Sequence, residues 1–213
     1  MKKIWKTLPL LCTAALLLAS GFAFAQDKKD EKPKDEPKKE KVVAAEIGKA
    51  APGFELKDLA GKTVKLSDYK GKIVVLEWFQ PSCPYCVKGY EEGGNCRSTA
   101  DKMQKDGVVY LLVNSSNAKD PNAKLEDNVE FFKSRKISET VLLDPDGKVG
   151  RAYGAKSTPH CMVIDAKGNL AYRGAIDNML EKDAKEKVNY VETAVRELKA
   201  DKPVSTKETR SYG

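Results

Sequence analysis

The sequence Cys83-Pro84-Tyr85-Cys86 constrains the fold and the chemistry of this chain more than any other feature. It follows an apolar run, residues 73–79, that reads as a buried strand, and it opens a stretch of helical character. A thiol at the start of a helix meets unpaired N–H groups and the positive end of the helix dipole, which favour the reactive thiolate. The motif therefore predicts a redox-active dithiol, and the alternatives are a structural disulfide or half of a zinc site.

Spacing assigns different roles to the two cysteines. Three residues of helix bring both sulfurs onto one face, within reach of a short bond. Cys83 is the expected attacking thiol, because it lies at or just before the first helical turn. Cys86 lies one turn further in and is the expected resolving thiol. Pro84 suits the first helical position, where its missing N–H costs nothing.

Glu77 is a carboxylate inside the apolar strand, six positions before Cys83. Strand alternation directs it to the same side as Phe79, beneath the expected active site. Burial would raise its pKa toward the range that suits a general base. The alternative is an acid at the margin of the sheet that reaches solvent.

Residues 1–25 have the pattern of a secretory signal peptide: three lysines, an apolar stretch at residues 8–19, and Ala23-Phe24-Ala25 as a cleavage site. The apolar stretch is shorter than the ~20 residues that span a bilayer, and an uncleaved N-terminal anchor is the alternative. We therefore expect a periplasmic or otherwise exported protein. Cleavage would remove Cys12 and leave four cysteines, whose three possible pairings the sequence does not distinguish.

Residues 26–41 alternate acids with lysines and contain no large apolar side chain, which predicts a disordered charged linker. The formal net charge of the chain is +7, and three of the lysines behind it belong to the signal. The acids of the linker nearly match its lysines, whereas an arm that binds nucleic acid would be predominantly basic. We expect no nucleic-acid partner.

Residues 42–200 are predicted to form one α/β domain, a mixed central sheet with helices on both faces. Near-continuous apolar runs indicate buried strands, and apolar residues at helical spacing indicate covering helices. Residues 201–213 are the expected C-terminal tail, loose after Pro203. The predicted strands are residues 54–59, 63–66, 73–79, 108–113, 141–143, 161–165 and 169–173, and the predicted helices are residues 84–105, weakened by three glycines, 125–136 and 185–199.

Two motifs together carry a family resemblance. Residues 77–86 resemble the active-site strand and helix start of the thioredoxin superfamily, and Ser157-Thr158-Pro159 resembles its cis-proline loop. Residues 47–177 resemble the redoxin branch, the alkyl hydroperoxide reductase and thiol-specific antioxidant family, close in type to TlpA-like periplasmic thioredoxins. The resemblance implies a thioredoxin-like fold.

The resemblance also implies roles for three residues. Glu77 would transfer protons to and from Cys86, and the bond before Pro159 would be cis. The backbone of Thr158 would pair with an extended substrate peptide, which is main-chain recognition tolerant of substrate sequence.

His160 and Cys161 are departures from ordinary thioredoxins. His160 is the only histidine of the chain, and it could stabilise a thiolate or hold a metal with the dithiol, although a surface histidine is the plainer expectation. Cys161 is expected to be a buried apolar side chain, with a disulfide to Cys96 as an option.

The first functional hypothesis is an exported thiol–disulfide oxidoreductase that acts on protein or small-molecule thiols and disulfides, is reset by a membrane-linked redox partner, and needs no cofactor. The second is a thiol peroxidase. Peroxiredoxins place proline and threonine seven and three positions before the reactive cysteine, and counting back from Cys83 gives Leu76 and Gln80. Counting back from Cys86 gives Phe79 and Cys83, so neither register fits. The third hypothesis is a thioredoxin-like module that binds copper or another metal.

Overall fold

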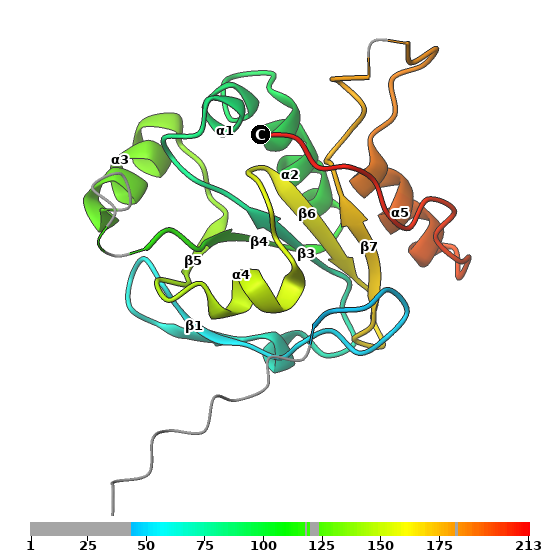
Figure 1. Ribbon diagram of the computed structural model, residues 1–213, viewed down its shortest axis with the longest axis horizontal. Coiled ribbons are helices and arrows are strands. Elements are labelled where there is room, and N and C mark those ends of the chain that lie inside the picture. Colours follow the sequence, from blue (N-terminus) through cyan, green and yellow to red (C-terminus); the bar gives the residue numbers. More distant parts are fainter. Residues whose placement is uncertain (1–43, 118, 120–123, 182) are drawn as a thin grey trace, which may run out of the picture. The chain divides into compact units, whose positions relative to one another are not determined.

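The computed structural model describes residues 44–213 except 118, 120–123 and 182. The predicted signal peptide, the linker at residues 26–41 and Cys12 lie outside the described residues. A seven-stranded sheet with the order β2-β1-β5-β4-β3-β6-β7 forms the centre of the domain (Figure 1). Its strands are β1 (Glu55–Asp58), β2 (Thr63–Lys65), β3 (Val74–Trp78), β4 (Val109–Asn114), β5 (Thr140–Leu143), β6 (His160–Ile164) and β7 (Leu170–Gly174), and the helices are the 3-10 helix η1 (Leu66–Tyr69), α1 (Pro84–Gly89), α2 (Asn95–Lys105), α3 (Leu125–Arg135), α4 (Lys148–Tyr153) and α5 (Tyr190–Lys199).

The sheet is mixed, as predicted. Strand β3 runs parallel to β4 and antiparallel to β6, and β4 runs parallel to β5. All five residues of β3 are buried, which agrees with the apolar run that predicted a central strand. Both predicted hairpins are present, since β1 pairs antiparallel with β2 and β6 with β7.

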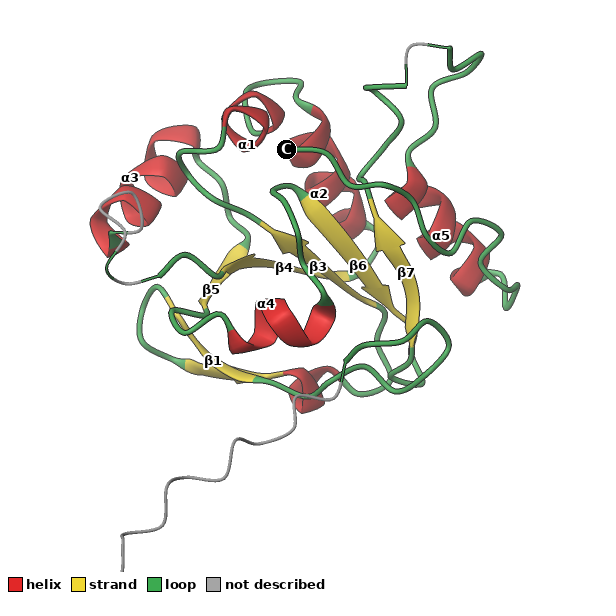
Figure 2. Ribbon diagram, viewed as in Figure 1, coloured by secondary structure: helices red, strands yellow, loops and turns green. Residues whose placement is uncertain are grey.

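Helices cover both faces of the sheet, as Figure 2 shows. On one face, alternate strand residues such as Val75, Leu112 and Val163 pack with side chains of α2, α3 and α5. On the other face, residues such as Leu76 and Met162 pack with Tyr153 of α4. The period of two along each strand therefore divides the core into two layers.

Three helical segments differ from the prediction. Residues 84–105 form two helices that are separated at residues 90–94. Gly94 lies against the backbone of Gly89 and is the N-cap residue of α2. The short helix α4 was not predicted; it follows the Asp-Pro-Asp-Gly turn and is too short for a clear apolar period. Helix α5 begins at Tyr190 rather than at residue 185, because the Asn189 side chain caps it by accepting from the N–H of Glu192.

The expectation of a loose C-terminal tail was wrong. The N–H of Arg173 in β7 donates to the Lys207 carbonyl at 3.0 Å, and the N–H of Thr209 donates to the Arg173 carbonyl at 3.1 Å. Val204 is buried in the core. The tail, red in Figure 1, runs past β7 and ends near α1. Edge-strand pairing and an apolar anchor order this segment.

No helix within residues 44–213, apart from the six positions that are not described, is long and apolar enough to cross a membrane.

Candidate active site

The dithiol lies where β3 passes into α1. Cys83 is the N-cap residue of this helix and Pro84 occupies its first turn, as predicted from the spacing. Cys83 is 8% exposed and Cys86 is fully buried. Both are free thiols, as are Cys96 and Cys161. The outer and inner cysteines thus have the placement that an attacking and a resolving thiol require.

The environment of Cys83 favours its thiolate. The neighbouring Cys86 thiol, which can donate a hydrogen bond to a thiolate, is the main cause that lowers the pKa of Cys83 to about 5. The Thr158 side chain and the N–H groups of Cys86 and Tyr85 act in the same direction, whereas burial opposes them. At neutral pH Cys83 is therefore a thiolate, which is the nucleophilic form.

Cys86 behaves in the opposite way. The hydrogen bond to Cys83 is the largest cause that raises the pKa of Cys86, followed by burial and by the nearby charge of Glu77. When the pair carries a single proton, that proton is on Cys86 and Cys83 is the thiolate. One cysteine is prepared to attack while the other stays protonated.

The cis-proline loop lies directly against Cys83. The bond between Thr158 and Pro159 is cis, which confirms the prediction. In its protonated form the Cys83 thiol donates to the Thr158 carbonyl at 2.9 Å, across 75 positions of sequence. The structure thus brings Thr158 and Pro159 to the dithiol, and this carbonyl is a main-chain acceptor beside the reactive sulfur.

Glu77 is fully buried beneath this site, so the alternative of an acid that reaches solvent was wrong. Its Oε2 accepts from the Tyr110 hydroxyl at 2.6 Å and from the Tyr90 hydroxyl at 2.8 Å. Its Oε1 has no hydrogen-bond partner. Burial is the main cause that raises the pKa of Glu77 to about 7, and the two tyrosines lower it in part. The carboxyl group can therefore gain or lose a proton near neutral pH.

Cys161 and Cys96 lie in the same buried layer as Glu77. Cys161 pairs directly with Glu77 between β6 and β3, so both side chains lie on one face of the sheet. Burial, and then the charge of Glu77, raise the pKa of both thiols well above the usual range. Cys161 is a buried side chain, as predicted, and the optional disulfide to Cys96 is not formed.

His160 was expected at the surface, but it is buried, with 4% of its surface exposed. It lies one position from Cys161 and so belongs to the opposite face of the sheet, with Trp78 as its strand partner. Its Nδ1 accepts from the N–H of Lys156 at 3.2 Å, and burial is the main cause that lowers its pKa to about 4. Across the described residues, no three His, Cys, Asp or Glu side chains are grouped to hold a metal ion.

Sequence reasoning missed the two tyrosines that hold Glu77. Tyr110 is a hydroxyl-bearing residue inside an apolar strand, which is a signal of a buried polar partner. Tyr90 follows α1, and its N–H donates to the Cys86 carbonyl at 2.9 Å. Tyr90 thereby connects the helix of the resolving cysteine to the buried carboxyl group. Nothing local in the sequence indicates that contact.

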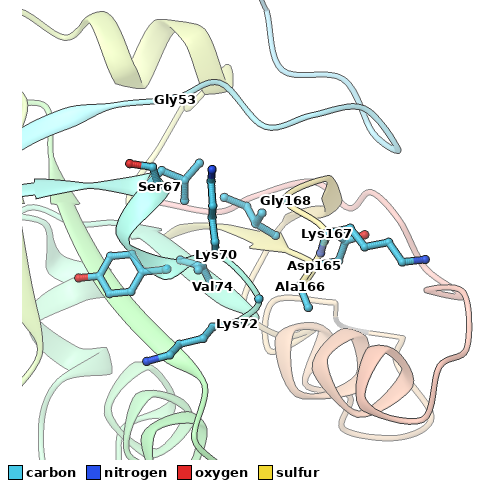
Figure 3. Close-up of a pocket in the computed structure, with 13 residues that line it drawn as sticks. Gly53, Ser67, Lys70, Lys72, Val74, Asp165, Ala166, Lys167 and Gly168 are labelled. Atoms are coloured by element: carbon cyan, nitrogen blue, oxygen red, sulfur yellow. Dashed lines mark hydrogen bonds between the residues drawn. The ribbon is translucent and has the colours of Figure 1, made fainter.

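A pocket of about 410 Å³ lies at the other end of β3, around Val74 (Figure 3). Lysine side chains and the loop of residues 165–168 line it. The dithiol follows the opposite end of this strand. The candidate active site around Cys83 is therefore separate from this pocket.

Comparison with known proteins agrees with this geometry. The model of the AhpC/TSA family matches residues 47–173. The thiol-disulfide oxidoreductase ResA of Geobacillus thermodenitrificans is 30% identical over 128 residues, which are 60% of this chain and 68% of the relative. The thiol:disulfide interchange protein DsbE of Vibrio cholerae is 30% identical over 170 residues, 79% of this chain and 84% of the relative.

Among solved structures, one described provisionally as a thioredoxin from Neisseria meningitidis has a TM-score of 0.52 and 31% identity, covering 68% of this chain and 89% of that chain. The fold, the family match and the relatives agree with the resemblance seen in the sequence. The chain belongs to the AhpC/TSA family, the redoxin branch of the thioredoxin superfamily.

Proposed function

We propose that this protein is an exported thiol–disulfide oxidoreductase in which Cys83 is the attacking thiol and Cys86 the resolving thiol. At the level of enzyme class, its relatives include a thiol-disulfide oxidoreductase and a thiol:disulfide interchange protein, and the chain is an oxidoreductase of this kind. The observation that carries the finer proposal is the placement of the two thiols. Cys83 is the N-cap residue of α1, with its sulfur 2.9 Å from the Thr158 carbonyl oxygen, whereas Cys86 is fully buried. The opposite pKa shifts of the two thiols agree with this placement.

In the first step the Cys83 thiolate attacks one sulfur of a substrate disulfide. A bond forms between Cys83 and that sulfur, the substrate disulfide breaks, and the leaving sulfur takes a proton from solvent. Thr158 and Pro159 would bind the substrate beside Cys83, with the Thr158 backbone pairing with an extended peptide. The Thr158 carbonyl oxygen lies 2.9 Å from the Cys83 sulfur, which supports this placement.

In the second step Cys86 must lose its proton to resolve the mixed disulfide. Glu77 is the proposed acceptor, because its pKa of about 7 allows it to take a proton at neutral pH. The Cys86 thiolate attacks the Cys83 sulfur, a Cys83–Cys86 disulfide forms, and the second substrate sulfur leaves and is protonated. The substrate gains two electrons and two protons, and an external dithiol, for which we propose a membrane-linked donor, must reduce the pair again.

A thiol peroxidase is the second candidate, since the family to which the chain belongs takes its name in part from alkyl hydroperoxide reductase. The expected proline and threonine are absent before either cysteine. In a peroxidase the attacking thiolate would reduce a peroxide O–O bond and become a sulfenic acid. A metal-binding module is not supported, because His160 lies on the opposite face of the sheet.

The test compares reduction of insulin disulfides with turnover of hydrogen peroxide by the wild-type protein, Cys83→Ser and Cys86→Ser. We expect insulin reduction by the wild type and none by either variant. Peroxide turnover that survives in Cys86→Ser, without any disulfide exchange by the wild type, would overturn the proposal in favour of the peroxidase.

A further inference from the structure

Residues 211–213 of the C-terminal tail lie on the cis-proline loop. The Ser157 hydroxyl contacts the Ser211 hydroxyl at 2.8 Å and donates to the Tyr212 carbonyl at 3.3 Å. A Cβ atom placed on Gly213 would lie 1.9 Å from the Thr158 carbonyl oxygen. Gly213 therefore packs against the same carbonyl oxygen that lies 2.9 Å from the Cys83 sulfur.

Tyr212 fills a polar subsite beside the dithiol. Its hydroxyl donates to Asp177 Oδ1 at 2.7 Å and accepts from Asn95 Nδ2 at 2.9 Å, and Asn95 also donates to Asp177 Oδ2 at 2.7 Å. The ring centroids of Tyr212 and Tyr85 are 5.9 Å apart. Two residues that are distant in sequence, Asn95 and Asp177, thus bind the Tyr212 hydroxyl, and its ring lies beside Tyr85, one of the two residues between the cysteines.

The preceding residues of the tail are firmly attached. The Thr209 hydroxyl accepts from the N–H of Ala175 at 2.9 Å and contacts the Tyr172 hydroxyl at 2.6 Å. Arg173 Nε donates to Glu208 at 3.0 Å. These contacts hold residues 208–209 at β7, so residues 211–213 are held near Cys83 even when they detach from the loop.

We propose that the surface formed by Ser157, Asn95 and Asp177 is a binding site for a peptide segment of a protein substrate, that residues 211–213 occupy it in the resting molecule, and that the substrate displaces them. The proposal rests on the function proposed above and goes further, because it names the substrate class. The tail occupies the main-chain position beside Thr158 where a substrate peptide would lie. A protein disulfide must displace the tail to reach Cys83, whereas a small disulfide needs less of this surface.

The test replaces Tyr212 by alanine and uses Lys207→Ala as a matched control, since Lys207 is an exposed tail residue whose contribution to the pairing is its backbone carbonyl. Two rates are measured: labelling of reduced Cys83 by a polyethylene-glycol maleimide, followed by mass spectrometry, and reduction of insulin against that of hydroxyethyl disulfide. Tyr212→Ala removes the two hydrogen bonds of the Tyr212 hydroxyl. It should therefore raise the rate of labelling by the bulky maleimide and the rate of insulin reduction roughly fivefold to tenfold. Hydroxyethyl disulfide reduction should change less, and Lys207→Ala should match the wild type.

Ser157→Ala provides a second variant that removes both hydroxyl contacts to the tail and leaves the core untouched. It should raise the labelling rate in the same direction, whereas insulin reduction should rise less than in Tyr212→Ala, because Ser157 is itself part of the proposed substrate site. Unchanged labelling in both variants would overturn the proposal, and so would slower insulin reduction with unchanged labelling, since Tyr212 would then be part of the wall that binds substrate. If no version reduces insulin, the proposed function fails, but the labelling rates still test whether the tail covers Cys83.

Discussion

The two cysteines of the motif share one proton unequally, and this difference can be measured at the level of single residues. We expect the thiolate absorbance of the reduced protein near 240 nm to rise with a midpoint near pH 5, and this step to vanish in Cys83→Ser. In Cys86→Ala the midpoint should move up toward the usual value of 9, because the main donor to the Cys83 thiolate is lost. A wild-type midpoint near pH 9 would contradict the assignment of the attacking thiol.

Glu77 makes stability depend on pH with a known sign. Its pKa is raised from 4.5 to about 7, so within this interval the folded protein holds a proton that the unfolded chain has released. The contribution of protonated Glu77 to the free energy of unfolding is fully present below pH 4.5 and is lost as pH rises through 7. Cys83 acts with the opposite sign between about pH 5 and 9, because its pKa is lowered.

Glu77→Gln isolates the effect of the carboxyl group. From pH 4.5 to pH 8 the free energy of unfolding of this variant should rise relative to that of the wild type by about 3 kcal/mol, since each pKa unit corresponds to about 1.4 kcal/mol. Glu126→Gln, at an exposed position of α3, is the control and should follow the wild type. Urea titrations at several pH values measure the difference, and parallel curves for Glu77→Gln and the wild type would exclude a buried, proton-binding Glu77.

The break between α1 and α2 depends on a close approach of two backbone segments. A Cβ atom on Gly94 would lie 2.3 Å from the Gly89 carbonyl oxygen and 2.7 Å from that of Lys88, and neither can move without moving α1. We expect Gly94→Ala to lower the free energy of unfolding by about 1–3 kcal/mol, as in other overpacked sites. Gly53→Ala meets no atom within 4 Å and should change it by less than about 0.5 kcal/mol. Equal urea midpoints for the two variants would show that the approach is not tight.

Most elements could be predicted from local patterns, because the buried strands are apolar runs and the hairpins carry turn residues. Strand β3 and the hairpin of β6 and β7 are examples. Helix α4 has only six residues, too few for a period to show. The residues of the candidate site also differ in how far the sequence predicts them. The dithiol motif and the cis-proline loop are local signals, so Cys83, Cys86 and Pro159 could be located. The contacts of Glu77 with Tyr90 and of Tyr212 with Asn95 join distant positions, and only the fold brings these residues together.

At the scale of the whole molecule, the export that we propose would decide which redox partners the protein meets. The signal pattern of residues 1–25 predicts cleavage after Ala25. When the full chain is produced in a bacterium that exports it, the mature protein should begin at Gln26, as determined by N-terminal sequencing of the periplasmic fraction. A protein that keeps Met1 and fractionates with membranes would favour the anchored alternative.

The fold brings together, on one surface, the Cys83 thiol that follows β3, a main-chain carbonyl of the cis-proline loop, and a tail whose Gly213 packs against that carbonyl. Cys83 is only 8% exposed in this arrangement. The buried carboxyl group of Glu77 is the proton acceptor that we propose for the second thiol. In the mechanism that we propose, Cys83 attacks the substrate disulfide and Cys86 resolves the mixed disulfide.

Trapping of the mixed disulfide tests that claim most directly. The reduced Cys86→Ser protein is incubated with a disulfide-bonded peptide, quenched with acid, and digested for mass spectrometry. We predict a stable disulfide between the peptide and Cys83 in Cys86→Ser, and no adduct on Cys86 in Cys83→Ser under the same conditions. An adduct on Cys86 in Cys83→Ser, together with an unmodified Cys83 in Cys86→Ser, would contradict the account.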